Sequence, residues 1–300
     1  MDVASDLCFK IARRMVVRRD RSVQRNAGSG RQVFDADAYR NWREEELRGQ
    51  FMSYFSPEDV AGKDVVDLGC GEGDLSFVMC ELGVKSITGI ELSERRYRSS
   101  VRRAEEKSWT VAPHFVLARR TDAVELPAES VDVLLCFDVL EHIMDYESVV
   151  ADWLRVLRPG GRVLIWWVPW WHPYGPHIES LVPIPWCHVL FSERTLLSTC
   201  ARVYDMSEFR PRIWDLDENG NKKPNKWRRM IRLPEVNKLT MAEFERLCAQ
   251  VGLRIRSKRQ RGFGSSPLAR LTRGFLRVPR LREYFTSSVV YELQKDLARV

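Results

Sequence analysis

The chain lacks the cysteine spacings that mark a disulfide framework or a zinc site. Its seven cysteines are an odd number, lie far apart and never form a C-x-x-C pair, which predicts free thiols in a reducing compartment. The sequence also lacks a basic start followed by an uninterrupted apolar stretch, so no secretory signal is expected. We therefore expect a cytoplasmic protein.

No uninterrupted apolar run is long enough for a membrane-spanning helix. The most apolar region, residues 163–191, contains five prolines and three histidines, which a helix inside a bilayer does not accommodate. The 48 basic and 41 acidic residues give a net charge of +7, which permits contact with nucleic acid or anionic lipid without requiring either.

The chain is organised as a basic N-terminal appendage, residues 1–33, and a domain over residues 34–300. The appendage ends in a glycine-rich linker signal. A flanking or lid helix is predicted over 36–56, followed by apolar runs that alternate with helical patterns near 75–83, 93–107 and 146–157. Such alternation predicts βαβ units and a parallel sheet. The expected strands are 64–68, 86–91, 114–117, 131–137, 162–168, 253–257 and 287–293.

The fold class that follows is α/β, a seven-stranded, mostly parallel, doubly wound sheet with a cap insertion after the fifth strand. The insertion covers about residues 169–238, and a helix over 241–252 returns the chain to the sheet with Gly252 as its stop. A basic C-terminal segment covers about 254–283.

The first strand runs into a turn rich in glycine. Asp67 is followed by Gly69, Gly71 and Gly73, and glycine lets a backbone turn sharply and approach a ligand closely. The dinucleotide pattern G-x-G-x-x-G is absent, because Asp74 stands where its last glycine belongs.

Two acids follow at the ends of the next strands. Glu91 lies 18 residues after Gly73 at the end of the second strand, where a carboxylate can accept hydrogen bonds from both ribose hydroxyls. Its alternative is an exposed acid at the start of a helix capped by Ser93. Asp122 follows the third strand, where it can accept from an exocyclic amine or cap a turn.

These segments resemble the class I, Rossmann-like S-adenosylmethionine-dependent methyltransferases, in particular the small-molecule branch of ubiquinone and menaquinone biosynthesis. The resemblance covers about residues 60–168 and rests on the following motifs: Val65–Gly73, Ile90-Glu91, Asp122-Ala123, residues 136–143 (Cys-Phe-Asp-Val-Leu-Glu-His-Ile) and residues 157–161 (Leu-Arg-Pro-Gly-Gly).

The resemblance implies S-adenosyl-L-methionine as the cofactor, and it implies where each part of the cofactor binds. Backbone at Gly69 and Phe137 would hold the methionine end, Glu91 the ribose, and Asp122 with Ala123 the adenine. The aromatic residues Tyr39 and Trp42, on the helix predicted over 36–56, resemble the family's cover over the cofactor. Their alternative is a place in the core.

Methyl transfer from a sulfonium needs alignment more than chemistry from the protein, but a hydroxyl acceptor also has to lose a proton. Histidine suits that step, and we expect His177, or secondly His172, to be the base. A histidine base favours O-methylation. Nearby ring side chains suggest a pocket for an apolar or aromatic acceptor; they are Trp170, Trp171, Tyr174 and His188. All of these residues could instead pack inside the insertion.

A second constellation, Asp138-x-x-Glu141-His142, follows the fourth strand. It is similar to an E-x-x-E-H pattern that supports a divalent metal in ubiquinone O-methyltransferases, but here the first acid is Asp. We expect no metal, with Glu141 lining or bracing the acceptor pocket and His142 as a further candidate for catalysis.

Other functions stay open at this point. RNA methylation is disfavoured because the fourth strand lacks both an Asn/Asp-Pro-Pro-aromatic motif and a Pro-Cys nucleophile. Methylation of a lipid-like acceptor at a membrane is an alternative, since apolar residues interleave with arginines near residues 11–18 and 268–282. A cofactor-binding protein without activity is a third. Oligomeric state is not predicted.

Overall fold

A computed structural model describes residues 3–27, 36–120, 124–217, 220–234, 236–263 and 272–297, without the side chains of 21–27, 36–39 and 213. The chain divides into two compact units. The first, here called the insertion unit, comprises Met1–Asp35 and Trp170–Val236; the second, the sheet unit, comprises Ala36–Pro169 and Asn237–Val300.

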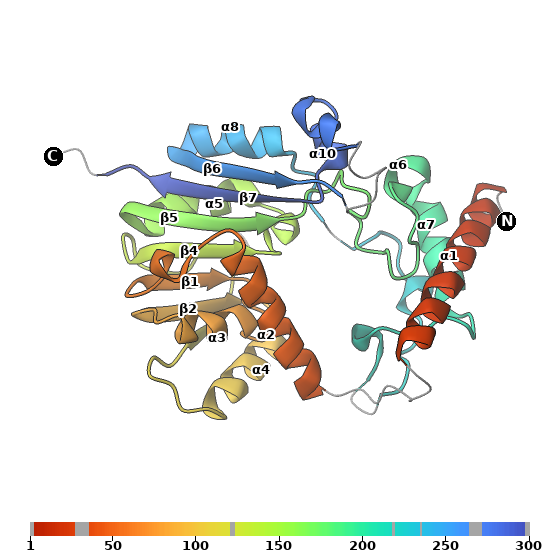
Figure 1. The fold of residues 1–300 in the computed structure, drawn as a ribbon, viewed down its shortest axis with the longest axis horizontal. Coiled ribbons are helices and arrows are strands. Elements are labelled where there is room, and N and C mark those ends of the chain that lie inside the picture. Colours follow the sequence, from red (N-terminus) through yellow and green to blue (C-terminus); the bar gives the residue numbers. More distant parts are fainter. Residues whose placement is uncertain are drawn as a thin grey trace. The chain divides into compact units, whose positions relative to one another are not determined.

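The sheet unit contains one seven-stranded sheet in the order β3-β2-β1-β4-β5-β7-β6 (Figure 1). Strands β1 to β5 are parallel, and β7 runs antiparallel to both β5 and β6. The predicted fold class, a seven-stranded and mostly parallel α/β sheet, is confirmed. The strands are β1 Asp64–Leu68, β2 Ser86–Glu91, β3 His114–Leu117, β4 Val131–Phe137, β5 Leu157–Trp167, β6 Leu253–Arg261 and β7 Ser288–Lys295.

Helices cover both faces of the sheet because successive strand residues point to opposite sides. Val66 and Leu134 pack on one face with α5 (Tyr146–Val156) and α8 (Met241–Val251). Val65 and Val133 pack on the other with α2 (Ala36–Met52) and α3 (Asp74–Glu81). The other helical elements of this unit are α4 Glu94–Glu105, α10 Arg282–Phe285 and the single turns η1 Pro57–Asp59, η2 Leu140–His142 and η5 Arg273–Arg277.

Two strand boundaries differ from the sequence prediction. Strand β5 begins at Leu157 rather than 162, because the register shifts between the pairs Val131–Leu157 and Val133–Arg162 and so absorbs a bulge. Strand β6 continues to Arg261 rather than 257. It is an edge strand whose exposed face carries charged residues, so the apolar signal fades before the pairing does.

The basic N-terminal segment forms the 25-residue helix α1 (Val3–Ala27) and belongs to the same compact unit as the insertion. Cys8, Ala12 and Val16 recur at a spacing of four residues and are buried in one apolar cluster with Leu196 and Cys200 of α7 (Glu193–Tyr204). Arg202 of α7 also forms an ion pair with Asp6. The remaining elements of this unit are α6 Cys187–Leu190, η3 Ile213–Asp215 and η4 Lys226–Arg228.

Burial of Val16 corrects one sequence interpretation. The sequence alternative of a membrane-facing set near residues 11–18 includes Val16. This residue is fully buried, and Met15 packs partly against the same cluster, so neither residue is free to face a membrane. Residues 268, 270 and 271 of the C-terminal set lie outside the described residues. No described helix combines the length and the apolar character that crossing a bilayer requires.

Candidate functional site

Three glycines form the turn that joins β1 to α3. Gly69, Gly71 and Gly73 all have positive φ, at +69°, +59° and +89°, a conformation that glycine adopts without strain. A Cβ on Gly69 would lie 2.7 Å from a methyl of Val139, and one on Gly73 would lie 2.8 Å from the ring of Phe115. These two glycines are therefore also required by packing.

Gly71 differs from its two neighbours because a Cβ there would have no atom within 4 Å. Open space at the centre of a tightly packed turn is the feature that a bound group would need. Gly71 lies at the carboxyl end of β1, the edge where ligands bind in open α/β sheets.

Glu91 fixes this turn to the end of β2. Its carboxylate accepts N–H groups from Gly71 at 2.9 Å and from Ser93 at 2.7 Å, and the residue is only 6% exposed. The alternative of an exposed acid at the start of α4 is therefore wrong, although Ser93 does cap that helix. Each carboxylate oxygen retains a lone pair that can accept from a hydroxyl.

Asp67 is the acidic residue that precedes the glycines, and it points into the interior. It is 2% exposed and accepts a hydrogen bond from the hydroxyl of Ser76 at 2.7 Å. Burial, assisted by the nearby Asp74 and Glu91, raises the pKa of Asp67 to about 7. The side chain therefore ties the turn to α3.

The end of β4 lies beside the end of β1, because the two strands pair in parallel. Phe137 is buried, and its ring lies 6.2 Å from the rings of both Phe51 and Phe55. The next residue, Asp138, has a φ of 61°, a strained value for a non-glycine residue. Its carboxylate pairs with Arg43 of α2 at 3.4 Å.

Glu141 and His142 have opposite environments despite being neighbours. Glu141 is fully buried, and neither carboxyl oxygen has a hydrogen-bond partner within the described part of the chain. Burial, assisted by Asp138, raises the pKa of Glu141 well above its ordinary value. His142 is exposed. Across the described ranges, no group of three or more His, Cys, Asp or Glu side chains could hold a metal.

Asn237 holds the turn around Glu141, a role that the sequence analysis did not predict. Its side-chain amide donates to the carbonyls of Leu140 and Ile143 at 2.7 and 2.8 Å, while its backbone N–H donates to the carbonyl of Glu141. Nearly a hundred residues separate these groups along the chain, so no local pattern could have revealed the contact.

The remaining predicted cofactor residues are less defined. Trp42 lies on α2 and is 55% exposed, so it is not a core residue. The backbone of Tyr39 lies on the same helix, but its side chain is outside the described residues. Asp122 and Ala123 also lie outside the described residues.

The predicted acceptor residues other than Glu141 fall in the insertion unit, which is described by itself. The ring of His188 lies 5.0 Å from that of Trp170 and 6.4 Å from that of Trp171. The ring of His172 lies 6.1 Å from that of Tyr174. The sequence-predicted aromatic and histidine side chains thus form two small clusters.

The two candidate bases of this unit differ sharply. His172 is 7% exposed, its Nδ1 accepts the backbone N–H of Tyr174 at 2.9 Å, and burial lowers its pKa to about 3. A histidine with such a low pKa and an occupied acceptor nitrogen is unsuited to take a proton. His177 is exposed and has a φ of 55°. The geometry therefore favours His177.

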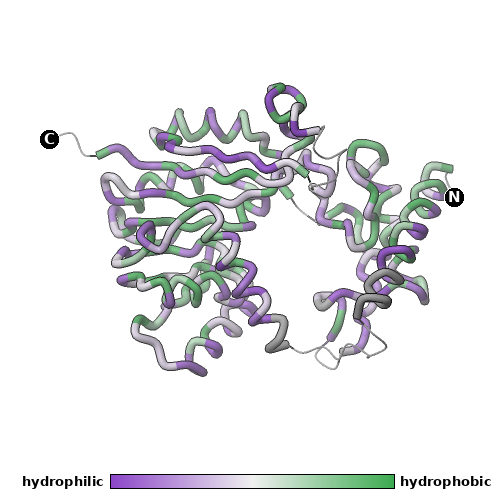
Figure 2. The backbone as a smooth tube through the Cα atoms, viewed as in Figure 1, coloured by the Kyte–Doolittle hydropathy of each residue, from purple (hydrophilic) through white to green (hydrophobic). Residues whose placement is uncertain are grey.

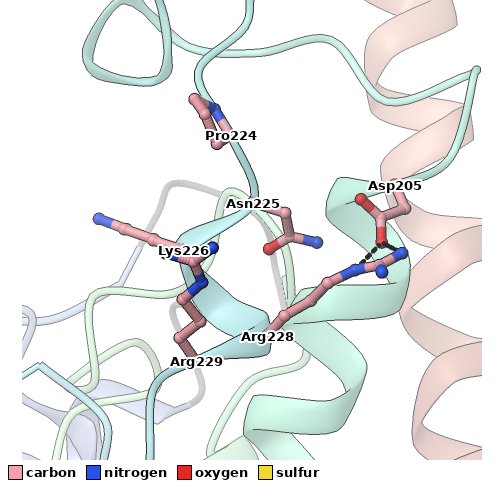
Figure 3. Close-up of a pocket in the computed structure, with 6 residues that line it drawn as sticks. All are labelled: Asp205, Pro224, Asn225, Lys226, Arg228 and Arg229. Atoms are coloured by element: carbon pink, nitrogen blue, oxygen red, sulfur yellow. Dashed lines mark hydrogen bonds and ion pairs between the residues drawn. The ribbon is translucent and has the colours of Figure 1, made fainter.

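A shallow pocket in the insertion unit involves none of these residues. It is lined by Asp205, Pro224, Asn225, Lys226, Arg228 and Arg229 (Figure 3). Two guanidinium nitrogens of Arg228 donate to Asp205 at 2.9 and 2.6 Å, whereas Lys226 and Arg229 extend away from that ion pair. This pocket contributes nothing to the predicted site.

Comparison with known proteins identifies the region that contains the glycine turn. Residues 66–165 match a family model described as a methyltransferase domain. The ubiquinone biosynthesis O-methyltransferase of Cupriavidus pinatubonensis is 40% identical over 106 residues, which cover 35% of this chain and 41% of that protein. The protein of the same name from Pseudomonas aeruginosa is 33% identical over 142 residues, which cover 44% of this chain and 59% of that protein.

The matched region is similar to a methyltransferase domain, and its sheet has the Rossmann-like order described above. A solved structure from Pyrococcus horikoshii shares the fold, with a TM-score of 0.50 at 16% identity over 85% of this chain and 91% of that one. The chain spans about half the length of the curated relatives. The predicted recognition is confirmed for the methyltransferase domain.

We predict that Asp67→Asn flattens the pH dependence of stability. A carboxyl whose pKa rises on folding contributes most to stability below its unfolded pKa near 4, and this contribution is lost as the pH rises toward 7. For Asp67 the loss is on the order of 4 kcal/mol. The free energy of unfolding in urea, measured at pH 5 and pH 8, should therefore fall more steeply for the wild type than for Asp67→Asn.

Asp64→Asn in the same strand is the matched control. Hydrogen bonds from Lys85 and Ser86 lower the pKa of Asp64 to about 2, so this substitution should leave the change between pH 5 and pH 8 as in the wild type. Parallel pH profiles for the wild type and Asp67→Asn would contradict the raised pKa.

Proposed function

We propose that the chain is an S-adenosylmethionine-dependent methyltransferase that methylates a hydroxyl on a small apolar or aromatic acceptor. The observation that carries the proposal is the open space at Gly71 beside the buried carboxylate of Glu91. The curated relatives are named O-methyltransferases of ubiquinone biosynthesis, which supports O-methylation and a small acceptor.

The residues of the sheet unit fit this donor. Backbone at Gly69 and Gly71 would hold its methionine end together with backbone at Phe137, and Glu91 would accept hydrogen bonds from the ribose hydroxyls. Asp122 with Ala123 would contact the adenine. When bound, S-adenosylmethionine supplies a methyl group on a positively charged sulfur.

The contribution of Glu91 depends on its immobility. Because two backbone N–H groups hold the carboxylate, its remaining lone pairs have fixed directions, and binding ribose costs little side-chain entropy. Trp42, exposed on α2, would cover the bound donor together with Tyr39.

The aromatic residues of the insertion unit would form the acceptor pocket. Trp170, Trp171 and Tyr174 offer flat apolar surfaces that suit an aromatic ring or a prenyl chain. The ring contacts of His188 with both tryptophans would brace this wall. An acceptor with an apolar tail fits the same surfaces.

Removal of the acceptor proton falls to His177 in this proposal. Glu141 is fully buried, so in this proposal it braces the turn after β4 rather than accepting a proton. Exposed His142 is the second candidate, because His172 is unsuited to the role.

Substitution of Gly71 by alanine tests the donor site. The new Cβ would fill the open space, so binding of S-adenosylhomocysteine should weaken at least about tenfold, while the positive φ costs about 1 to 2 kcal/mol of stability. Titration calorimetry measures the binding, and thermal unfolding measures the stability.

Gly62→Ala is the matched control for this experiment. Gly62 also has a positive φ, +67°, with nothing within 4 Å of a Cβ, but it precedes β1 and so lies at the opposite end of that strand. It should lose similar stability and keep full affinity. Equal affinities for both variants, or no binding by the wild type, would overturn the donor assignment.

Substitution of His177 tests the proposed base. His177→Ala should lower turnover about 100-fold or more with unchanged affinity for S-adenosylhomocysteine. The assay follows a labelled methyl group into a panel of phenols and catechols.

Two further variants separate catalysis from folding. His177→Gly relieves the positive φ and should be more stable than His177→Ala while remaining equally inactive. His114→Ala removes an exposed histidine at the start of β3 and should keep full turnover. Undiminished turnover in His177→Ala would assign this residue a packing role.

A further inference from the structure

The net charge of the chain is concentrated in the insertion unit. Its 102 residues contain 18 basic and 12 acidic side chains, a net charge of +6 out of the total of +7. The larger sheet unit is therefore almost neutral. Any electrostatic attraction to a polyanionic surface originates mainly in the insertion unit.

Helix α1 presents a face that mixes apolar and basic side chains. Val3, Leu7 and Ile11 are 83%, 54% and 36% exposed, and the exposed cations Lys10, Arg14 and Arg18 lie between them on the wheel. The six residues occupy an arc of about 100° and a length of about 22 Å. Figure 2 shows the alternation of apolar and polar residues along this helix.

This face is the one that the fold of the insertion unit leaves open. The opposite face of α1, with Cys8, Ala12 and Val16, is buried against the insertion. Positions 3, 7, 10, 11, 14, 17 and 18 include no acidic residue.

The other charged side chains described on this helix are compensated. Arg13 pairs with Glu208, and Asp6 pairs with Arg202. By contrast, Lys10, Arg14 and Arg18 form no ion pair with any residue in the described ranges. The mixed face therefore has positive charge available for a partner.

We propose that this face of α1 docks the protein on the surface of an anionic lipid bilayer. Helices that lie in the interface insert their apolar side chains at the boundary of headgroups and acyl chains. Lysine and arginine extend their charged ends to the lipid phosphates while their stems lie along apolar surface. The mixture of three apolar and three basic side chains on one arc matches both requirements.

The apolar half of the face is the reason for choosing a bilayer over nucleic acid. Binding to a phosphate backbone is driven by cations and polar groups and gives no stabilising role to Val3, Leu7 or Ile11. The proposal is independent of the methyltransferase function, since it requires neither donor nor acceptor.

Flotation of the full chain with lipid vesicles tests the docking. Wild-type protein should float with vesicles of phosphatidylcholine and phosphatidylglycerol and should not float with phosphatidylcholine alone. Salt should weaken the binding, because it screens the electrostatic part. Absence of binding to anionic vesicles at low salt would overturn the proposal.

Charge reversal on the mixed face should abolish docking. Each cation near an anionic surface strengthens binding about fivefold, so the triple variant Lys10→Glu, Arg14→Glu, Arg18→Glu should lose at least about 100-fold in partitioning. Circular dichroism checks that the helix and its thermal transition are retained. If the triple variant unfolds, the milder double variant Arg14→Gln, Arg18→Gln replaces it. Its partitioning onto vesicles should fall about 25-fold.

A matched charge reversal elsewhere on the same unit separates this face from net charge. Lys226→Glu, Arg229→Glu, Arg232→Glu changes the charge by the same amount at exposed positions and should retain most of the binding. An equal loss in both triple variants would contradict docking through α1.

The apolar residues need a test of their own. Val3→Gln with Leu7→Gln should weaken vesicle binding about tenfold or more at high salt, while Val189→Gln with Leu190→Gln, which are also exposed, should leave it unchanged. If the first pair leaves vesicle binding unchanged and the protein binds duplex RNA more tightly than vesicles, a nucleic-acid surface replaces the proposal. Calorimetry with S-adenosylhomocysteine on the same variants keeps the two proposals separate.

Discussion

The hydrogen bond from the Gly71 N–H to the Glu91 carboxylate is the constraint on which the glycine turn depends. It joins the turn after β1 to the end of β2, and the second oxygen of Glu91 extends the connection to the start of α4 through Ser93. A buried carboxylate with no partner would be costly. The turn that supplies the Gly71 N–H to Glu91 also leaves open space where a Cβ on Gly71 would lie.

Packing around this bond explains why the three glycines are not equivalent. Gly69 is pressed against Val139, which follows β4, and Gly73 against Phe115 of β3. The turn is therefore fixed on one side by the residue that follows β4 and on the other by β3, and it leaves one free direction, at Gly71. A glycine motif in a sequence indicates a turn, but only the surrounding contacts distinguish the glycine that faces a ligand from those that face the core.

The sheet was predictable because its strands are short apolar runs bounded by turn residues, and their alternation with helical patterns permits few topologies. Contacts between distant segments were not predictable. The apolar stripe of α1 gives no sign that its partner is α7, and Val16 therefore resembled a membrane-facing residue although it is buried. The same limit applies to Asn237, whose hydrogen bonds hold a turn nearly a hundred residues away.

The two units also differ in their net charge. Near the glycine turn, Asp74 and Glu72 form ion pairs with Arg103 and Arg95, and the sheet unit as a whole is almost neutral. The insertion unit carries nearly all of the net positive charge, which favours an anionic surface. Burial lowers the pKa of His172 and raises the pKa of Glu141, so in each unit the shifted pKa belongs to a side chain that is packed in the interior.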